Sequence, residues 1–262
     1  MIELINQDCL KAIPSLKNNS VDLVITSPPY FNAKEYAFYS TYQDYLDFLT
    51  QVFTAVFPKI KAGRMLAVNL SVVIEPRLKR TQESKRYPIP FHFVPLMEDI
   101  GYKFIEDIIW QKPEGAAKNR NGNFSKHRKP IAYKPNVVNE YILVFQKPSN
   151  YLIDKIVKDC PSDSLVQDGY ERTNIWNINP ANSLSKLHSA PFPIELPQKL
   201  VEYYSFKNDL ILDMFMGIGS TALACDNLNR NFVGIELDPH YFNLATQRIL
   251  AFDLSKEILH AK

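Results

Sequence analysis

Short apolar runs alternate with longer amphipathic stretches along most of this chain of 262 residues. The runs are rich in β-branched and aromatic residues and are bounded by turn-forming residues, which is typical of strands buried in a sheet. They predict strands over residues 2–6, 22–26, 65–70, 104–110, 140–146, 210–214 and 231–236. Between them, apolar residues recur at helical spacing and predict helices over residues 42–60, 194–204, 220–228 and 241–251.

The order of these elements indicates an α/β protein, with a doubly wound, mostly parallel sheet covered by helices on both faces. The strands at 104–110 and 140–146 have no clear helix between them, so we expect an antiparallel hairpin at the sheet edge. Residues 149–190 are too polar and too interrupted for the core. We expect them to form either a small separate lobe or a segment draped over the rest.

The helix predicted at 42–60 carries signals at both ends. Ser40 and Thr41 precede it and can cap its first turn. Asp44 places a negative charge in that turn, where it interacts favourably with the helix dipole. Gly63 follows it, and glycine is the residue that most readily terminates a helix. We therefore expect this helix to end near Gly63.

Length and composition fit one large globular domain, or one domain with an added segment, since 46% of the residues are hydrophobic and 22% are charged. Neither a signal peptide nor an apolar run of about twenty residues is present, so we expect a cytoplasmic protein with no membrane partner. The three cysteines, Cys9, Cys160 and Cys225, are far apart and include no Cys-x-x-Cys pair. Neither a disulfide framework nor a zinc site is therefore expected.

Positive charge is concentrated in two loop-like segments, although the net charge is only +2. Residues 77–86 contain five Lys or Arg against one Glu, and residues 112–134 contain seven against one Glu. Either segment alone is explained as well by a solvated loop, but the two together favour binding to the phosphates of a nucleic acid. The candidate contacts are Arg77, Lys79, Arg80, Lys118, Arg120, Lys126, His127, Arg128 and Lys129.

A glycine-containing turn connects a predicted strand near the C-terminus to the helix that follows it. Gly217 and Gly219 permit tight turning and close approach of a ligand, and Ser220 and Thr221 lie where the free N–H groups of a helix attract a carboxylate or a phosphate. Glu236 ends the next strand, where an acidic side chain can accept hydrogen bonds from a ribose. This spacing favours a nucleoside-cofactor site over a purely structural turn. The third glycine of a dinucleotide motif and the lysine of a P-loop are both missing.

The strand predicted at 22–26 ends on Ser27-Pro28-Pro29-Tyr30. One interpretation is a rigid turn that terminates the strand and exposes a tyrosine, and the other is a catalytic loop. Prolines have no N–H and a fixed φ, so the loop presents oxygen acceptors without competing donors and holds them still. The acceptors are the Ser27 hydroxyl and a backbone carbonyl around Pro28. Taken alone, the four residues support both interpretations equally.

Thr-Ser-Pro-Pro-Tyr at residues 26–30, together with Asp-Met-Phe-Met-Gly-Ile-Gly-Ser-Thr at residues 213–221, resembles the motifs of the S-adenosylmethionine-dependent DNA amino-methyltransferases. The first stretch resembles the catalytic loop of that family and the second its cofactor loop, and the likeness extends over nearly the whole chain. Because the catalytic loop comes first, the order resembles the permuted beta class, in which the target-recognition segment lies between the two loops.

The resemblance implies a Rossmann-like methyltransferase fold with a seven-stranded sheet, an antiparallel edge hairpin and a small recognition insertion. It divides the chain into a catalytic half at residues 1–148, with basic loops at 75–90 and 112–139, a target-recognition segment at 149–190 and a cofactor-binding half at 191–262.

Two shorter matches accompany the main motifs. Residues 6–10 resemble the segment whose acidic residue, here Asp8, meets the adenine of the cofactor, and Asp8 and Glu236 are then expected to end neighbouring strands. Residues 188–196 resemble the segment that lines the methionine pocket. The chain departs from the family at Met214, where proline is frequent, and at Ile218, where serine is frequent. The implied contacts to S-adenosyl-L-methionine are Asp8, Cys9, Ser27, Pro191, Phe192, Asp213, Phe215, Gly217, Gly219, Ser220, Thr221, Glu236 and Leu237.

The resemblance also makes Ser27, Pro28, Pro29 and Tyr30 the expected catalytic residues. An exocyclic base amine is a poor nucleophile because its lone pair is delocalised into the ring. Acceptors aimed at the amine hydrogens localise that lone pair, and their preorganisation makes the effect strong. Tyr30 is expected to stack on a base flipped out of the duplex. Neither a metal nor a covalent intermediate is needed.

Within the resembling family, Ser at the first loop position is associated mostly with the N4 amine of cytosine, and Asp or Asn mostly with the N6 amine of adenine. We therefore expect a site-specific cytosine-N4 methyltransferase acting on double-stranded DNA, with the adenine-N6 enzyme as the alternative. Protein-glutamine and RNA methyltransferases can have a similar loop and are a less favoured alternative. Those enzymes resemble the unpermuted class, in which the cofactor loop comes first, whereas this chain has the reverse order. A catalytically silent DNA-binding module is disfavoured by the intact loops. A homodimer and a cognate restriction endonuclease, as in restriction–modification systems, are further expectations.

Overall fold

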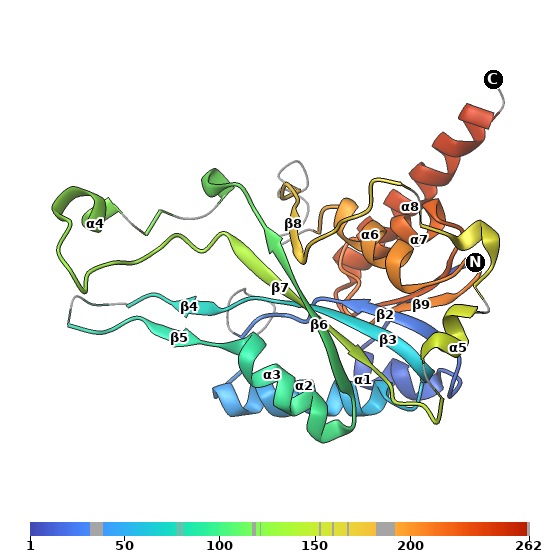
Figure 1. The fold of residues 1–262 in the computed structure, drawn as a ribbon, viewed down its shortest axis with the longest axis horizontal. Coiled ribbons are helices and arrows are strands. Elements are labelled where there is room, and N and C mark those ends of the chain that lie inside the picture. The colour runs from blue at the N-terminus through green and yellow to red at the C-terminus, as the bar shows by residue number, and fades with distance from the viewer. Residues whose placement is uncertain are drawn as a thin grey trace.

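An eight-stranded sheet forms the centre of the part of the protein that the structure, a computed structural model, describes: residues 1–31, 39–77, 79, 81–116, 119–120, 122–151, 153–158, 160–166, 168–181 and 192–260. The strand order is β1-β10-β9-β2-β3-β7-β6-β8 (Figure 1). The strands of this sheet are β1 (Ile2–Asn6), β2 (Val21–Thr26), β3 (Ile60–Leu70), β6 (Lys103–Gln111), β7 (Asn139–Gln146), β8 (Ile175–Asn177), β9 (Leu210–Asp213) and β10 (Asn231–Glu236). This confirms the predicted fold class.

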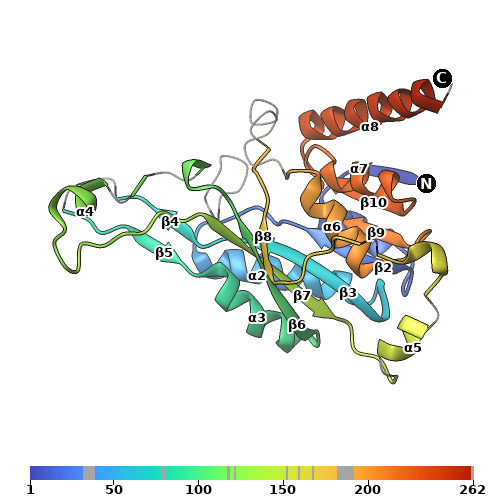
Figure 2. The ribbon, with the colours of Figure 1, turned by 45° about the horizontal axis from the view of Figure 1, so that its top comes forward.

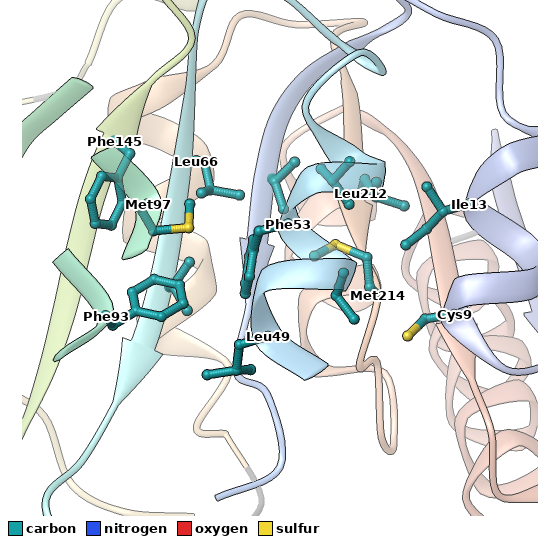
Figure 3. Close-up of a cluster of buried hydrophobic side chains, with 14 of the residues drawn as sticks. Cys9, Ile13, Leu49, Phe53, Leu66, Phe93, Met97, Phe145, Leu212 and Met214 are labelled. Atoms are coloured by element: carbon teal, nitrogen blue, oxygen red, sulfur yellow. The ribbon is translucent and has the colours of Figure 1, made fainter. Parts of the chain in front are cut away.

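Helices cover both faces of the sheet (Figures 1 and 2). The helices that pack on the two faces are α1 (Cys9–Ala12), α2 (Tyr42–Val56), α3 (Ile89–Ile100), α6 (Glu195–Tyr204), α7 (Ser220–Asn227) and α8 (Pro239–His260). The shorter helices α4 (Gly122–His127) and α5 (Ile153–Lys158) lie in the connections after β6 and β7. Alternate residues of the central strands enter two separate cores. Val24 and Leu212 pack with α1, α2 and α3, whereas Leu23 and Ile211 pack with α6, α7 and α8. Figure 3 shows part of the first core, in which Phe53, Phe93 and Phe145 meet between helix and sheet.

The strand directions determine which ends meet. The five strands from β1 to β3 in the sheet order pair in parallel, β7 is antiparallel to both β3 and β6, and β8 is parallel to β6. The carboxyl ends of β2, β3, β6, β9 and β10 therefore lie along one edge, and the amino end of β7 lies there too. Because β1 pairs with β10 in register Asn6 to Glu236, the two termini of the chain contribute neighbouring strands, as predicted.

The predicted hairpin of β6 and β7 is antiparallel, but it is not at the sheet edge. Ile175–Asn177, which we placed outside the core, adds the eighth strand beside β6. Trp176 at its centre is 3% exposed, and Trp110 Nε1 donates to the carbonyl of Ile178 over 2.8 Å. The strand is too short, and its neighbours too polar, for hydrophobic alternation to reveal it. Two buried indole rings stabilise it instead.

Other described parts of the 149–190 segment run along α6. The Tyr203 hydroxyl accepts a hydrogen bond from the backbone N–H of Glu171 at 3.0 Å, and Lys199 forms an ion pair with the Glu171 carboxylate at 2.6 Å. Ser164 Oγ accepts from the backbone N–H of Lys207. Of the two arrangements left open by the sequence, these contacts match the draped one.

Helix α2 begins as predicted but ends earlier. Thr41 and Asp44 form a reciprocal capping box at its start, in which each side chain accepts from the backbone N–H of the other residue. The helix ends at Val56 rather than near Ile60, because Pro58 has no N–H to donate and its ring excludes a continuing helix. Gly63 lies inside β3, with φ of 79°.

Two arms extend from the carboxyl edge of the sheet to the same side of the molecule (Figures 1 and 2). One is a hairpin of β4 (Val73–Glu75) and β5 (Lys85–Tyr87), which begins directly after β3. The other is the β6–β7 connection, which carries α4 at its far end. The two basic segments identified in the sequence lie in these arms. No helix within the described ranges is long and apolar enough to cross a membrane.

Candidate active site

A cavity of about 880 Å³ lies at the carboxyl ends of β2, β3, β9 and β10. Its lining includes all of residues 27–30 and all of residues 213–218, so the two main sequence motifs meet in one place. The cavity lies between β9, whose helix α7 covers one face of the sheet, and β2, whose helix α2 covers the other. In doubly wound sheets such a reversal of the connection opens a crevice that holds ligands.

Asp213 joins the two motifs. Its Oδ1 accepts from the Thr26 hydroxyl and its Oδ2 from the Thr221 hydroxyl, each at 2.8 Å, and the backbone N–H of Phe215 donates to Oδ1 at 3.1 Å. The carboxylate thereby connects the residue before Ser27 with the start of α7. Burial raises the pKa of Asp213 to about 6, against the opposing effect of these three hydrogen bonds. Because both of its oxygens already accept hydrogen bonds from the protein, Asp213 holds the two loops in position.

A pH dependence follows from this carboxyl group. An acid whose pKa is raised by folding holds its proton more tightly in the folded state, so its stabilisation is present at low pH and is lost as the pH rises through about 6. The free energy of unfolding of the wild type should therefore fall by about 2 kcal/mol more than that of Asp213→Asn between about pH 4.5 and 7.5. Urea-induced unfolding of the two proteins across this range measures the difference. Parallel profiles would contradict the raised pKa.

Ser27 follows β2 directly and is oriented by the neighbouring strand. Its hydroxyl donates to the backbone carbonyl of Asn69, at the end of β3, over 3.2 Å. Asn69 Nδ2 also donates to Ser27 Oγ over 3.5 Å. Because the hydroxyl hydrogen is engaged by the carbonyl, one lone pair of Ser27 Oγ remains to accept from a ligand in the cavity. Pro28 is buried behind it. The loop thus presents an oxygen acceptor on a fixed backbone, as predicted from its sequence.

Tyr30 lies in a hydrogen-bonded cluster that the sequence did not reveal. Its hydroxyl donates to Glu140 Oε2 at 2.7 Å and accepts from Asn69 Nδ2 at 2.8 Å. Asn69 Nδ2 also donates to Glu140 Oε2, and the Lys112 ammonium pairs with Glu140 Oε1. Burial, and next the Glu140 charge, raise the pKa of Tyr30 well above its usual value, so the phenol stays neutral. The hydrogen bonds to the Tyr30 hydroxyl therefore fix the position of its aromatic ring.

Three of these residues come from three separate strand ends. Asn69 belongs to β3, Glu140 to the start of β7, and Lys112 follows β6. The sequence analysis did not identify Glu140 or Lys112 as site residues. The one available signal was the strong polarity of Glu140 at the start of an apolar strand. Its meaning depends on β7 being antiparallel, which brings its first residues beside the last residues of β3.

Glu236 occupies the other end of the cavity. Its two carboxylate oxygens accept from the backbone N–H groups of Gly217 and Asp238, each at 2.8 Å. Burial raises its pKa, whereas these hydrogen bonds lower it. A carboxylate has about four acceptor directions, so capacity remains for a ligand hydroxyl. Gly217 and Glu236 are therefore positioned together, as their spacing predicted.

Gly219 allows the turn into α7 to pack closely. Its φ is 79°, and an added Cβ would lie 3.2 Å from Cβ of Ala245 in α8. The hydroxyl of Ser220 donates to the carbonyl of Phe192 at 2.9 Å, and that of Thr221 is held by Asp213. Both side chains are almost fully buried and already paired. They stabilise the turn, and because both residues also line the cavity, their contact with a cofactor stays a prediction.

The remaining predicted cofactor contacts surround the same space. Asp8 caps α1 by accepting from the N–H of Leu10 at 2.8 Å, and the neighbouring Cys9 is 7% exposed, with burial raising its thiol pKa to about 12. Leu237 is 66% exposed, which leaves an apolar side chain at the rim. Phe192 and Phe215 also line the cavity. Pro191 lies outside the described residues.

The predicted phosphate contacts lie on the two arms, away from the cavity. Those that are described are Arg77, Lys79, Arg120, Lys126, His127, Arg128 and Lys129. All are exposed except Arg120, which is half-buried. Arg80 and Lys118 lie outside the described residues. Among the described residues, no cluster of three His, Cys, Asp or Glu side chains could hold a metal ion.

Comparison with known proteins places this geometry in a family context. The model of the family described as DNA methylase matches residues 21–247. The Type II beta methyltransferase M.BslI of Bacillus sp. (strain NEB-606) is 26% identical over 276 residues, covering 99% of this chain, which spans 29% of that longer protein. The Type II methyltransferase M.BglI of Bacillus subtilis is 24% identical, with 95% of this chain and 86% of the relative covered.

Among solved structures, a putative DNA modification methylase of Thermus thermophilus, TTHA0409, has a similar fold. Its complex with S-adenosyl-L-methionine aligns with a TM-score of 0.77 and 27% sequence identity, covering 96% of this chain and 94% of that one. The likeness therefore extends over nearly the whole chain.

Proposed function

We propose, from the premise that this chain belongs to the DNA methylase family, that it transfers a methyl group to the N4 amine of cytosine in double-stranded DNA. Family membership makes the chain an S-adenosylmethionine-dependent DNA amino-methyltransferase, with the loop order of the beta class. Cytosine as the target, the roles of individual residues and base flipping are the parts that we propose. The observation that carries the residue roles is the joining of residues 27–30 and the glycine turn in one cavity. The choice of cytosine depends on Ser27 and Lys112.

The residues present fit S-adenosyl-L-methionine. Glu236 offers spare acceptor capacity for ribose hydroxyls, and Leu237 offers exposed apolar surface for the adenine. Gly217 lines the cavity and carries no side chain that would occupy it. The cavity volume of about 880 Å³ lies within the range of roughly 300–1,000 Å³ typical of ligand sites. When bound, the cofactor supplies a methyl group on a positively charged sulfur.

The chain's own contribution is to make the amine nucleophilic. Ser27 Oγ, whose hydrogen is donated to Asn69, accepts from one amine hydrogen and favours the tetrahedral form of the nitrogen. A carbonyl around Pro28 supplies the second acceptor. Within the described residues, the buried Oδ1 of Asn69 also lacks a hydrogen-bond partner, so the wall beside Ser27 contains one unused acceptor. Tyr30 stacks on the base while Glu140 and Asn69 hold its hydroxyl.

Lys112 adds a reason for cytosine beyond the association of Ser27 with that base. It lines the same cavity and carries hydrogen-bond donors. The Watson–Crick edge of cytosine has a carbonyl oxygen on the side of the ring nitrogen opposite the amine, whereas adenine has a C–H there. A donor on that side would therefore favour cytosine, since a flipped base is recognised by hydrogen bonds to this edge.

The target base is tested by chemistry on the product. DNA incubated with the protein and S-adenosyl-L-methionine is digested to nucleosides and analysed by mass spectrometry. We expect N4-methylcytosine. Detection of N6-methyladenine instead would show that adenine is the target base. If no methylated nucleoside were found with DNA from several sources, the proposed activity would be contradicted. A homodimer and a cognate restriction endonuclease stay predictions.

A further inference from the structure

A second cavity, of about 640 Å³, adjoins the first, and its lining includes none of residues 27–30 or 213–221. Lys112 lines both cavities, so they lie on the two sides of one side chain. The walls of the second cavity come from the carboxyl ends of β6 and β8 and from the β6–β7 arm. Its volume is within the range of sites that hold small organic groups.

Three exposed carboxamides line this cavity. Gln111 ends β6 and pairs in register with Asn177, which ends β8. Asn179 lies two residues further on, beyond the buried Ile178, so Asn177 and Asn179 point to the same side. All three side chains are therefore presented on one face of the sheet end. We call Gln111, Asn177 and Asn179 the carboxamide triad.

The backbone beneath the triad is held rigidly. Trp110 and Trp176 are an in-register pair, each 3% exposed, on the opposite side of the two strands. Trp110 Nε1 donates to the carbonyl of Ile178, and the N–H of Ile178 donates to the carbonyl of Gln111 at 3.2 Å. The triad is thus fixed by buried rings and by the ladder, although its own side chains face outward.

The charges around the cavity indicate which chemical group it would accept. Glu114 also lines it, with its carboxylate near the Asn136 amide, and Lys112 is neutralised by Glu140. A phosphate would meet the Glu114 carboxylate with no unpaired cation among the described lining residues. An uncharged base edge instead presents donors and acceptors side by side, which is the pattern that Asn and Gln match with two hydrogen bonds. The exposed ring of Tyr133 in the same lining offers a stacking surface.

We infer that the second cavity is a base-recognition subsite, in which the carboxamide triad reads the edge of a nucleobase that flanks the target base. The inference rests on the proposed function, because it takes the first cavity as the site of the target base. It assigns sequence discrimination to β6 and β8, at the sheet end, while the cations of the arms hold phosphates without regard to sequence.

The test measures which sequences are methylated. Plasmid DNA modified by wild type, by the single variants Gln111→Ala, Asn177→Ala and Asn179→Ala, and by the triple variant is sequenced with modification-sensitive reads. We expect the preference at one position near the target base to fall by about tenfold or more in the triple variant. Affinity for S-adenosyl-L-methionine and the Tm should stay at their wild-type values, because all three side chains are exposed.

Two further variants make the result specific. Gln51→Ala removes an exposed carboxamide from α2, away from either cavity, and should leave the recognised sequence unchanged. Asn177→Asp keeps the shape of the side chain but removes its hydrogen-bond donors. The variant should therefore fold normally and prefer a different base at the position that Asn177 reads. An unchanged consensus in the triple variant, or an equal loss of methylation at all sequences, would overturn the inference. A wild-type protein that methylates no DNA would instead overturn the proposed function itself.

Discussion

Ser27→Ala is expected to lower the turnover number of methyl transfer by about 10²–10³-fold, the range found when one preorganised hydrogen-bonding group of a catalytic site is removed. The hydroxyl oxygen of Ser27 is held by its donation to the Asn69 carbonyl, so its acceptor direction is set before the substrate arrives. Alanine removes the acceptor and leaves the loop backbone, with its two prolines, in place. The dissociation constant for S-adenosyl-L-methionine should change little, because the residues that surround the Glu236 end of the cavity are untouched.

Ser20→Ala is the matched control for this change. Ser20 precedes β2 at its other end, and its hydroxyl also donates to a backbone carbonyl, that of Lys17, over 2.7 Å. The two substitutions therefore remove the same group and a similar hydrogen bond from opposite ends of one strand. Single-turnover rates and equilibrium cofactor binding should separate them. Wild-type turnover in Ser27→Ala would show that the catalytic assignment is wrong.

Glu236→Gln is expected to raise the dissociation constant for S-adenosyl-L-methionine by about 10- to 100-fold, the effect of losing a hydrogen bond to a charged group. The two carboxylate oxygens accept from the N–H groups of Gly217 and Asp238, and a glutamine would direct its own NH₂ group at one of these donors. The substitution therefore weakens both the proposed ribose contact and the glycine turn. At saturating cofactor the turnover number should approach that of the wild type, because the Ser27 loop is unchanged.

Glu3→Gln removes the same charge from an exposed position on β1 and serves as the control. Isothermal titration calorimetry and the dependence of rate on cofactor concentration measure the two effects independently. If Glu236→Gln lost turnover but bound the cofactor normally, the placement of the ribose beside Glu236 would be contradicted.

The local features of this site could be read from the sequence because each depends on a few consecutive residues. The prolines after Thr26 remove N–H groups wherever the loop lies, and the positive φ of Gly219 is a property of the turn itself. Family resemblance then identified the two loops as parts of one site. The capping box of α2 was predictable for the same local reason, whereas its end was misplaced because Gly63 was weighted above Pro58.

The features that were missed depend on contacts between distant segments. Glu140 meets Tyr30 and Asn69 only because β7 runs antiparallel to β3, and no periodicity within β7 specifies that direction. Strand β8, which pairs with β6 at the edge of the sheet, was missed because its three residues are too few to show hydrophobic alternation. The hydroxyls of Ser220 and Thr221 are a further case, because their partners, the carbonyl of Phe192 and the carboxylate of Asp213, could not be read from the glycine turn alone.

The sequence by itself determined the α/β class, the order of the two loops and the acceptor character of Ser27, since these follow from local composition and backbone restriction. Only the tertiary structure decided that Asp213 holds both loops together, that Glu140 orients Tyr30 and that the carboxamide triad lies beside the cavity in which the two loops meet. The physical reason is strand order and register. Hydrogen bonding between strands far apart in the chain decides which of their ends meet, and a one-residue change of register would turn each of these side chains to the other face.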